Sequence, residues 1–347
     1  MNDIARVLEV LQERRANRFA MATIIRVEGS SYRHEGAKML VNENGESFGI
    51  ISGGCLEEDL IPRAKEVLQT GEAKVLTYNL RAEDDLSWGQ GTGCNGIVHI
   101  YLEAIGSWGE AKGEGPSPWS FINEKLELGL RVGAAKWIEG KNNRSEEALY
   151  CEDGDCFPRS ARYSPTRMLE DLKGFLSQEK TTEVIVKKNV GTILMEQYNP
   201  KEVLYLFGAG PDAEPLVEMA SRLDFSVRLI DPRQHRCNSK IFPSADQLIN
   251  DFPNNYLHEQ NIRANSFVVI MTHNFERDRF ILKHFLNSPP RYLGILGSKK
   301  RTRRLLFDQP LPNWLHAPVG LGIHAEGPEE IAVSIAAELV QCRNGRR

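Results

Sequence analysis

The spacing of apolar residues in the first hundred positions alternates between helical and strand-like patterns. A 3.6-residue apolar period predicts an opening helix over 4–17. A continuous apolar run then predicts a buried strand over 19–27. Asn44-Gly45 is a strong turn signal and predicts a hairpin between strands 38–42 and 47–51. The other elements expected in this half are a helix over 56–70 and strands over 74–80 and 97–103, which together predict an α+β domain over 1–105.

The pattern becomes mixed over residues 106–200. Residues 106–118 are rich in Gly, Pro and Ser, which predicts an exposed linker. Beyond it the expected elements are helices over 119–130 and 165–178 and strands near 132–138, 147–151 and 183–195. Asp153-Gly154 predicts a tight turn between Cys151 and Cys156. This segment is either a small module of its own or an extension of the first domain.

From residue 203 strands alternate with helices. The alternation predicts a parallel, doubly wound sheet over 201–347. The fold class is therefore α/β, with an N-terminal α+β domain followed by a C-terminal Rossmann-like doubly wound sheet. The expected strands are 203–207, 226–230, 267–271 and 291–296. One helix is expected to follow the first strand and to end near 222, and three more are expected over 275–287, 298–307 and 327–342. The last helix has proline at its first position.

Composition narrows the class of protein. The chain has 347 residues, 41% of them hydrophobic, and a net charge of -4, which favours neither nucleic acid nor a membrane as partner. The amphipathic start lacks the apolar core of a signal peptide, so we expect a cytoplasmic protein. Six cysteines are too few for a disulfide framework and are expected to be free thiols.

One glycine turn has the context of a dinucleotide site. Gly208 and Gly210 follow a strand, and Asp231 ends the next strand, where its carboxylate would accept a hydrogen bond from a ribose hydroxyl. Pro215 and Asp212 complicate this. Pro215 lacks an N–H and fits only within the first helical turn, which places the helix start near 213 with Asp212 as N-cap and brings a carboxylate close to any phosphate. A Rossmann fold with and one without bound NAD(P) both remain open.

Two further features lie at the carboxyl ends of predicted strands, the edge where such sheets bind ligands. His273 is a candidate acid, base or ligand, although Thr272 or Asn274 would equally serve to cap the next helix. Ser298 and Lys299 open a basic helix whose cations oppose the helix dipole unless an anion sits there. A solvated basic face is the alternative.

Two other glycine turns each contain one cysteine. Cys55 follows Gly53 and Gly54 and begins a helix, while Cys94 lies among glycines that include Gly91 and Gly93. Such loops offer many backbone N–H groups to an anion, with few side chains in the way. The alternative is that both thiols are small buried hydrophobes.

Several ordered motifs resemble the XdhC/CoxI family over residues 4–105 and 203–342. They are Gly29-Ser30-Ser31-Tyr32-Arg33, Gly36-Ala37-Lys38-Met39, Ser52-Gly53-Gly54-Cys55-Leu56-Glu57, Gly93-Cys94-Asn95-Gly96, Phe207-Gly208-Ala209-Gly210, Asp231-Pro232-Arg233, Thr272-His273, Leu296-Gly297-Ser298-Lys299, Ala317-Pro318-Val319-Gly320-Leu321 and Pro328-Glu329-Glu330-Ile331-Ala332.

The resemblance implies an accessory factor for xanthine dehydrogenase and related molybdenum hydroxylases. Such a factor binds molybdenum cofactor, supports its sulfuration with a cysteine desulfurase and delivers it to the apo-enzyme, without turnover of its own. It also implies a cofactor role for Arg33 and contact of Cys55 and Cys94 with molybdenum, to which soft thiolates are suited. The sequence leaves the oligomeric state open, and a homodimer is one of the states that it allows.

Two other functions compete with this interpretation. An NAD(P)-dependent oxidoreductase would use the turn at Gly208, with Asp231 and His273. An assembly scaffold would use its glycine loops only structurally and would bind neither ligand.

Overall fold

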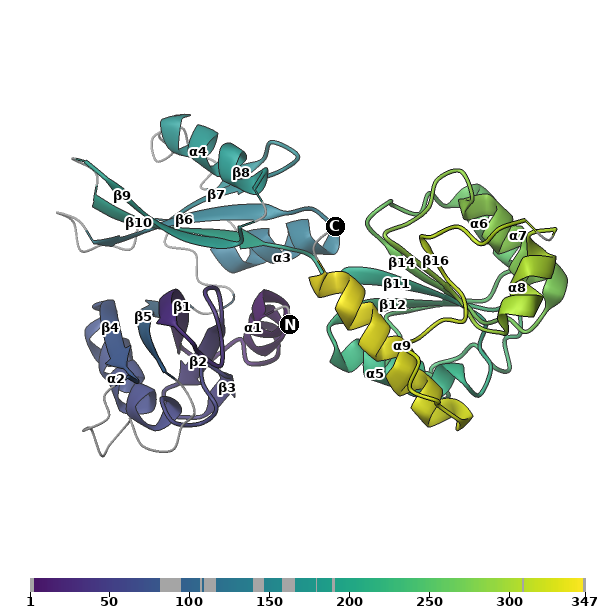
Figure 1. Cartoon of the computed structure of the whole chain (residues 1–347). Helices are drawn as coiled ribbons and strands as arrows, with labels where there is room; N and C mark the ends of the chain where they lie inside the picture. Colours follow the sequence, from purple (N-terminus) through teal and green to yellow (C-terminus); the bar gives the residue numbers. More distant parts are fainter. Residues whose placement is uncertain are drawn as a thin grey trace. The chain divides into compact units, whose positions relative to one another are not determined.

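The chain divides into two compact units, Asn2–Pro200 and Lys201–Arg347 (Figure 1). The structure is a computed structural model of the whole chain. It describes residues 3–81, 95–106, 108, 117–139, 147–157, 166–178, 180–188, 191–307 and 309–345. Within these residues, no helix has the length and apolar character needed to cross a bilayer.

The first sheet of the N-terminal unit is antiparallel, with strand order β3-β2-β1-β5-β4. Helix α2 packs its apolar face on this sheet through Leu60, Ala64 and Val67. The expected hairpin at Asn44-Gly45 is confirmed, and Gly45 has the positive φ of 89° that such a turn requires. The elements are α1 (Asp3–Glu13), β1 (Phe19–Gly29), β2 (Lys38–Asn42), β3 (Ser47–Gly49), α2 (Glu57–Thr70), β4 (Lys74–Asn79) and β5 (Gly96–Ile105).

A second antiparallel sheet, with order β8-β7-β6-β10-β9, belongs to the same compact unit. The expectation of one strand over 183–195 was wrong, because the chain reverses there and forms two paired strands, β9 and β10. Gly191, at a φ of 115°, starts the second of them. The turn between Cys151 and Cys156 is confirmed. The elements are α3 (Pro118–Glu127), β6 (Val132–Glu139), β7 (Glu147–Cys151), β8 (Cys156–Phe157), α4 (Thr166–Leu176), β9 (Thr182–Lys187) and β10 (Gly191–Tyr198).

Buried ion pairs connect the two sheets of this unit. Lys38 on β2 donates to Glu196 on β10 at 2.5 Å, and the two side chains are only 3% and 2% exposed. Lys136 on β6 donates to Glu103 on β5 at 2.7 Å and is equally buried. Burial acts to raise the pKa of Glu196, but the two lysines outweigh it and hold that pKa below its usual value. Each charge therefore depends on its partner in the opposite sheet.

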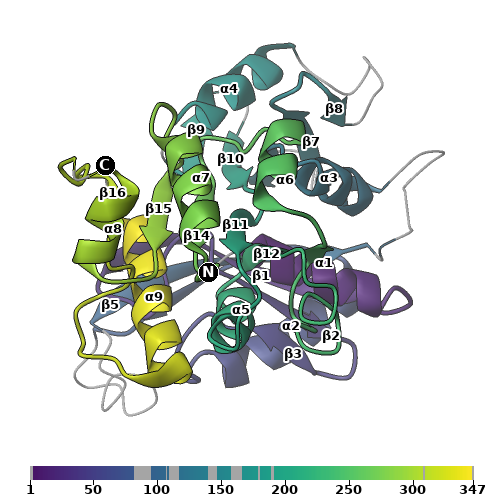
Figure 2. The same ribbon diagram turned by 90° about the vertical axis from the view of Figure 1, so that its right-hand side faces the viewer.

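The C-terminal unit contains one parallel sheet with strand order β13-β12-β11-β14-β15-β16. This is the Rossmann order, and it confirms the predicted doubly wound fold. Helices α5 and α9 pack together on one face, and α6, α7 and α8 cover the other (Figure 2). The elements are β11 (Glu202–Phe207), α5 (Ala213–Arg222), β12 (Phe225–Ile230), β13 (Gln247–Ile249), α6 (Pro253–Glu259), β14 (Phe267–Ile270), α7 (Phe275–Phe285), β15 (Tyr292–Ile295), α8 (Lys299–Leu305), β16 (Leu315–His316) and α9 (Gly327–Asn344).

Three short elements of the C-terminal unit lack a sequence signal. Strands β13 and β16 and helix α6 were not expected, because two, three or seven residues are too few to show a period. The proline of the last helix is also displaced by one residue. Helix α9 begins at Gly327, so Pro328 occupies its second position, which still needs no backbone N–H.

The Lys38–Glu196 pair yields a stability prediction. Lys38→Met should lower the free energy of unfolding by about 3–5 kcal/mol, because it leaves the Glu196 carboxylate buried without its cation. Denaturant unfolding measures this. The double variant Lys38→Met/Glu196→Gln should recover part of the loss, and Lys180→Met, at the exposed pair with Glu183, should cost about 0.5 kcal/mol or less. Equal losses at the two lysines would contradict the prediction.

Candidate functional site

Three connections leave the same edge of the first sheet. Gly29, the end of β1, pairs with Gly96, the start of β5, and Gly49, the end of β3, pairs with Met39 near the start of β2. The connection 30–37 therefore starts and finishes at this edge, the connection 50–56 starts there, and the chain leaves β4 at Leu80 and enters β5 at Asn95 on the same side. We call this set the loop edge.

The loop that contains Cys55 is held from inside by Ser52. The Ser52 hydroxyl oxygen accepts hydrogen bonds from the backbone N–H groups of Gly54 and Leu56, at 3.2 and 3.1 Å. The same hydroxyl donates to the Glu57 carboxylate. The Cys55 sulfur lies 3.5 Å from the Ser52 hydroxyl oxygen. The loop thus has a defined shape before any ligand arrives.

Glu57 completes this arrangement from the first turn of α2. Its Oε1 accepts the backbone N–H groups of Ile51 and Ser52 at 3.1 and 2.8 Å. Burial acts to raise the pKa of Glu57, but the hydrogen bonds from the Ser52 side chain and from the backbone outweigh it, so its pKa lies below the usual value. The carboxylate is therefore ionised at neutral pH and holds the loop against the helix.

With respect to the described residues, the two glycines of this loop adjoin open space. A Cβ added at Gly53 or at Gly54 would meet no described atom within 4 Å. Gly54 also has a φ of 113°, which disfavours any other residue. Cys55 is half-buried and packs against the core of the first sheet. Its thiol is neither fully exposed nor enclosed in the interior.

The other residues predicted for this site lie in two places. Gly91, Gly93 and Cys94 fall outside the described residues. Arg33 lies at the loop edge, where it donates to the Asp3 carboxylate at 2.5 Å and to the carbonyl oxygen of Ile50 at 3.4 Å. Arg33 therefore joins the start of α1 to the connection that contains Cys55.

The glycine turn of the C-terminal unit lies tightly against the neighbouring strand. A Cβ on Gly208, at a φ of 117°, would come within 2.3 Å of the Met271 carbonyl oxygen, so only glycine fits. This close approach of β11 to the end of β14 forms the point where the strand order reverses.

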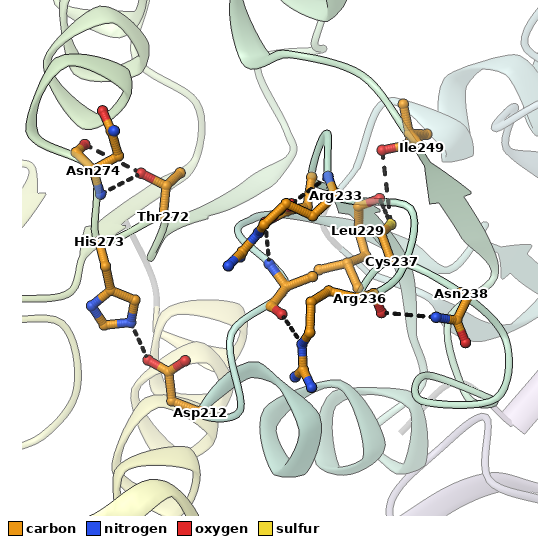
Figure 3. Close-up of polar contacts among 12 residues, drawn as sticks. Asp212, Leu229, Arg233, Arg236, Cys237, Asn238, Ile249, Thr272, His273 and Asn274 are labelled. Atoms are coloured by element: carbon orange, nitrogen blue, oxygen red, sulfur yellow. Dashed lines mark hydrogen bonds and ion pairs between the residues drawn. The ribbon is translucent and has the colours of Figure 1, made fainter.

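Asp231, the expected ribose acceptor, is engaged within the protein. Four donors fill its two oxygens: the backbone N–H groups of Ala209 and Arg233, at 2.9 and 2.8 Å, and two guanidinium nitrogens of Arg233. Its side chain is 1% exposed. Arg236 also donates to the Ala209 carbonyl oxygen at 3.0 Å (Figure 3). A ribose hydroxyl would have to displace one of these donors.

Asp212 does not cap α5, contrary to expectation. It occupies the N-cap position with helical dihedral angles, and its side chain makes no capping hydrogen bond. Its Oδ2 instead lies 2.7 Å from Nε2 of His273, and its Oδ1 is buried with no hydrogen-bond partner among the described residues (Figure 3). That second oxygen lies 2.3 Å from where a Cβ on Gly210 would be, so a negative charge lies against the turn.

His273 and Asn274 divide two roles that the sequence left open. Asn274 caps α7 by accepting the backbone N–H of Arg277 at 3.0 Å. His273 has a φ of 56° and a side chain that is 60% exposed. Ser298 caps α8 through the backbone N–H of Arg301 at 3.2 Å, and Lys299 is exposed beside it.

Sequence reasoning missed the residues that organise these two turns. Ser52 and Glu57 shape the Cys55 loop, and Arg233 fills the Asp231 carboxylate. A carboxylate early in a helix that follows a glycine turn was the available signal for Glu57, and an arginine two residues beyond the strand-end acid was the signal for Arg233.

Comparison with known proteins agrees with this architecture. The family model for the XdhC and CoxI family matches residues 12–79, and the model for the XdhC Rossmann domain matches residues 204–339. A Bacillus subtilis (strain 168) protein, described as a probable xanthine dehydrogenase subunit, is 38% identical over 323 residues, which are 93% of this chain and 92% of that protein. The chain belongs to the XdhC and CoxI family.

Two further relatives extend the comparison within the family. A crystal structure described as a xanthine dehydrogenase from Bacillus halodurans is 40% identical, with a TM-score of 0.83 over 100% of this chain and 97% of that chain. The Escherichia coli (strain K12) molybdenum cofactor insertion chaperone PaoD is 21% identical over 330 residues, which are 93% of this chain and 83% of that protein.

Glu57 gives a pH-dependent prediction. A carboxylate with a lowered pKa in the folded state stabilises the protein above the unfolded value, and this stabilisation is lost as pH falls through the folded pKa. Glu57→Gln should therefore be less stable than the wild type at pH 7, by about 1–3 kcal/mol. Thermal unfolding across pH measures the difference. It should shrink as pH falls below the usual carboxyl value of 4.5, and a constant difference would contradict the prediction.

The C-terminal turn gives a second prediction. The wild type should bind NADH with a dissociation constant of about 1 mM or higher. The Asp231 carboxylate is already hydrogen-bonded within the chain, Pro211 offers no N–H, and the Asp212 carboxylate lies beside Gly210. Asp212→Ala should bind it more tightly, because the repulsion of the pyrophosphate is removed. NADH fluorescence titration decides this, and saturable micromolar binding by the wild type would refute it.

Proposed function

We propose that this chain is an accessory factor for a xanthine dehydrogenase-type enzyme and carries molybdenum cofactor as cargo at the loop edge. Membership of the XdhC and CoxI family supports the accessory role. The relative PaoD, whose name describes insertion of this cofactor, supports the choice of cargo. In this proposal a cysteine desulfurase supplies sulfur, and the apo-enzyme of a molybdenum hydroxylase receives the loaded cofactor.

The observation that carries the proposal is the open, preformed loop at Gly53 and Gly54 beside the half-buried thiol of Cys55. A molybdopterin presents a phosphate, dithiolene sulfurs and a soft metal centre. The backbone N–H groups of Gly53 and Cys55, which Ser52 and Glu57 do not engage, suit the phosphate, and a thiolate suits the metal. Both kinds of group are available within three residues of this loop.

Cys94 enters the proposal through its place in the sequence. It directly precedes Asn95, whose backbone N–H donates to the Ser30 hydroxyl at 3.2 Å at the loop edge. We propose that Gly91, Gly93 and Cys94 contribute a second set of contacts to the same cargo. Arg33, at this edge, would add a cation, although the hydrogen bonds to Asp3 and Ile50 already engage it.

The proposed contacts, two thiolates and a few hydrogen bonds to the cofactor, suit a protein that binds the cofactor transiently better than one that retains it. A carrier must release its cargo on contact with the recipient, so its affinity has to come from contacts that the recipient can replace one at a time. The Ser52–Glu57 hydrogen bonds shape the loop without covering it, which keeps the ordering cost of binding low.

An NAD(P)-dependent oxidoreductase is the second candidate function. It relies on the C-terminal turn, where His273 is exposed and paired with Asp212. The filled Asp231 carboxylate disfavours it, because the ribose acceptor of that fingerprint is already satisfied within the chain.

Cargo retention by cysteine variants tests the proposal. Purified protein mixed with molybdopterin should keep it through gel filtration, measured as pterin fluorescence after oxidation. Cys55→Ala and Cys94→Ala should each weaken retention at least about tenfold, because a metal contact is lost. Cys156→Ala, at a half-exposed thiol in a hairpin of the same unit, is the matched control and should not change it. Unchanged retention in both Cys55 and Cys94 variants would sink the proposal.

A further inference from the structure

Helices α7 and α8 concentrate positive charge on an otherwise acidic chain. Residues 275–307 contain nine lysines and arginines but two acidic residues, whereas the whole chain has a net charge of -4. One of those acids, Asp278, is buried and paired with Arg301 at 2.6 Å. The other, Glu276, lies 3.4 Å from Arg279. Most of the cations are therefore left facing solvent.

The exposed stripe of α8 is unfavourable for the helix that bears it. Lys300, Arg303 and Arg304 are exposed and follow helical spacing, so they share one side of α8, and the exposed Phe307 comes two residues after the helix ends. Lys300 and Arg304 stand four residues apart, where like charges repel. The cations at the start of α8 also oppose the helix dipole. Folding alone gives no reason for this arrangement.

Aromatic rings hold several of these guanidinium groups in place. Arg279 lies 4.7 Å from the Phe275 ring and 4.9 Å from the Phe307 ring, and Arg304 lies 5.6 Å from Phe275. The Nε of Arg279 is buried without a hydrogen-bond partner in the described part of the chain. The charges are thus ordered in advance on a rigid platform, as cation–π contacts allow.

Phe307 adds an exposed apolar group to this platform. Its side chain is 70% exposed, and its φ of 54° is a conformation that favours glycine. A large ring in a strained backbone position, open to solvent, gains little from the fold. Together with arginine, an exposed aromatic ring is the composition typical of residues that dominate protein–protein binding.

We propose that the surface formed by Arg279, Lys300, Arg301, Arg303, Arg304 and Phe307, the α7–α8 basic surface, docks an acidic patch on a partner protein. The inference goes beyond the proposed cargo, which we assign to the other compact unit. Carboxylates of the partner would pair with the guanidinium groups, and an apolar side chain would cover the Phe307 ring.

The spread of the charge favours a protein over a small anion. The cations of the α7–α8 basic surface come from two helices, Arg279 from α7 and Lys300, Arg303 and Arg304 from α8, and the α8 residues alone span about 6 Å along the helix axis. One phosphate group reaches only a few ångströms of this length. Nucleic acid is disfavoured by the net negative charge of the rest of the chain, which would repel a polyanion.

A charge-reversal experiment tests the surface. The probe is a fluorescein-labelled peptide rich in Glu and Asp that also carries leucine, titrated by anisotropy at several salt concentrations. Lys300→Glu/Arg304→Glu should weaken its binding about tenfold and flatten the salt dependence. Arg15→Glu/Lys240→Glu reverses the same amount of exposed charge elsewhere and should change binding less than about twofold. Equal weakening by the two double variants would show a net-charge effect and overturn the proposal.

Phe307 separates a protein partner from other anionic partners. Phe307→Ala should weaken peptide binding without altering the salt dependence, because it removes apolar contact and no charge. Single-stranded RNA and vesicles containing phosphatidylserine, tested at the same salt, should bind more weakly than the peptide. Unchanged affinity in Phe307→Ala, or tighter binding of RNA or vesicles, would overturn the proposal.

The same variants distinguish this inference from the cargo proposal. Lys300→Glu/Arg304→Glu should retain molybdopterin as the wild type does, and Cys55→Ala should bind the peptide as the wild type does. A wild-type protein that holds no molybdopterin would refute the cargo proposal alone. A wild-type protein that binds no acidic peptide, even at low salt, would refute the basic surface alone.

Discussion

Hydrogen-bonded strands must run parallel or antiparallel, and this constraint decides where the connections of each unit gather. In the first sheet, the pairing of Gly29 with Gly96 and of Met39 with Gly49 brings three connections to one edge. In the C-terminal sheet, all strands run the same way, so every strand ends at the same edge as Gly208 and His273. Local sequence shapes each loop, but strand direction decides which loops are neighbours.

At both edges a carboxylate organises the backbone of a glycine turn. Glu57 accepts two backbone N–H groups of the loop before it, and Asp231 accepts those of Ala209 and Arg233. The consequences differ. Glu57 shapes its loop without placing a described atom against Gly53 or Gly54. Asp231 is hydrogen-bonded to Arg233, so it is not available as the acceptor for a ribose hydroxyl of a dinucleotide. A carboxylate that accepts backbone N–H groups thus leaves the Cys55 loop accessible to a ligand but disfavours dinucleotide binding at the Gly208 turn.

Charge is handled differently in the two units. In the N-terminal unit, Lys38 and Lys136 are buried and each is matched by a glutamate of the opposite sheet, which ties the sheets together. In the C-terminal unit, the cations of α8 remain exposed and crowded along one stripe. A buried charge needs an oppositely charged partner within the protein, because burial without one is costly. An exposed charge is solvated by water and can pair with a group on another molecule.

Periodicity was enough to predict the Rossmann sheet and most helices, because long elements repeat their pattern many times. The Asn-Gly turn signal predicted the hairpin at Asn44-Gly45. Short elements such as β13 and β16, and the division of 183–195 between the paired strands β9 and β10, were missed because they lack such repetition. The cysteine and glycine residues of the candidate site were likewise visible in the sequence.

What each polar side chain does was decided only by the tertiary structure. Asp212 was expected to cap α5, but it binds His273, which is 61 residues away in the chain. Arg33 is engaged by Asp3 and Glu196 by Lys38, over separations of 30 and 158 residues. The sequence determined which elements form and which chemical groups are available. A carboxylate or a guanidinium accepts any of several partners, so its role depends on which one the fold brings within hydrogen-bond distance.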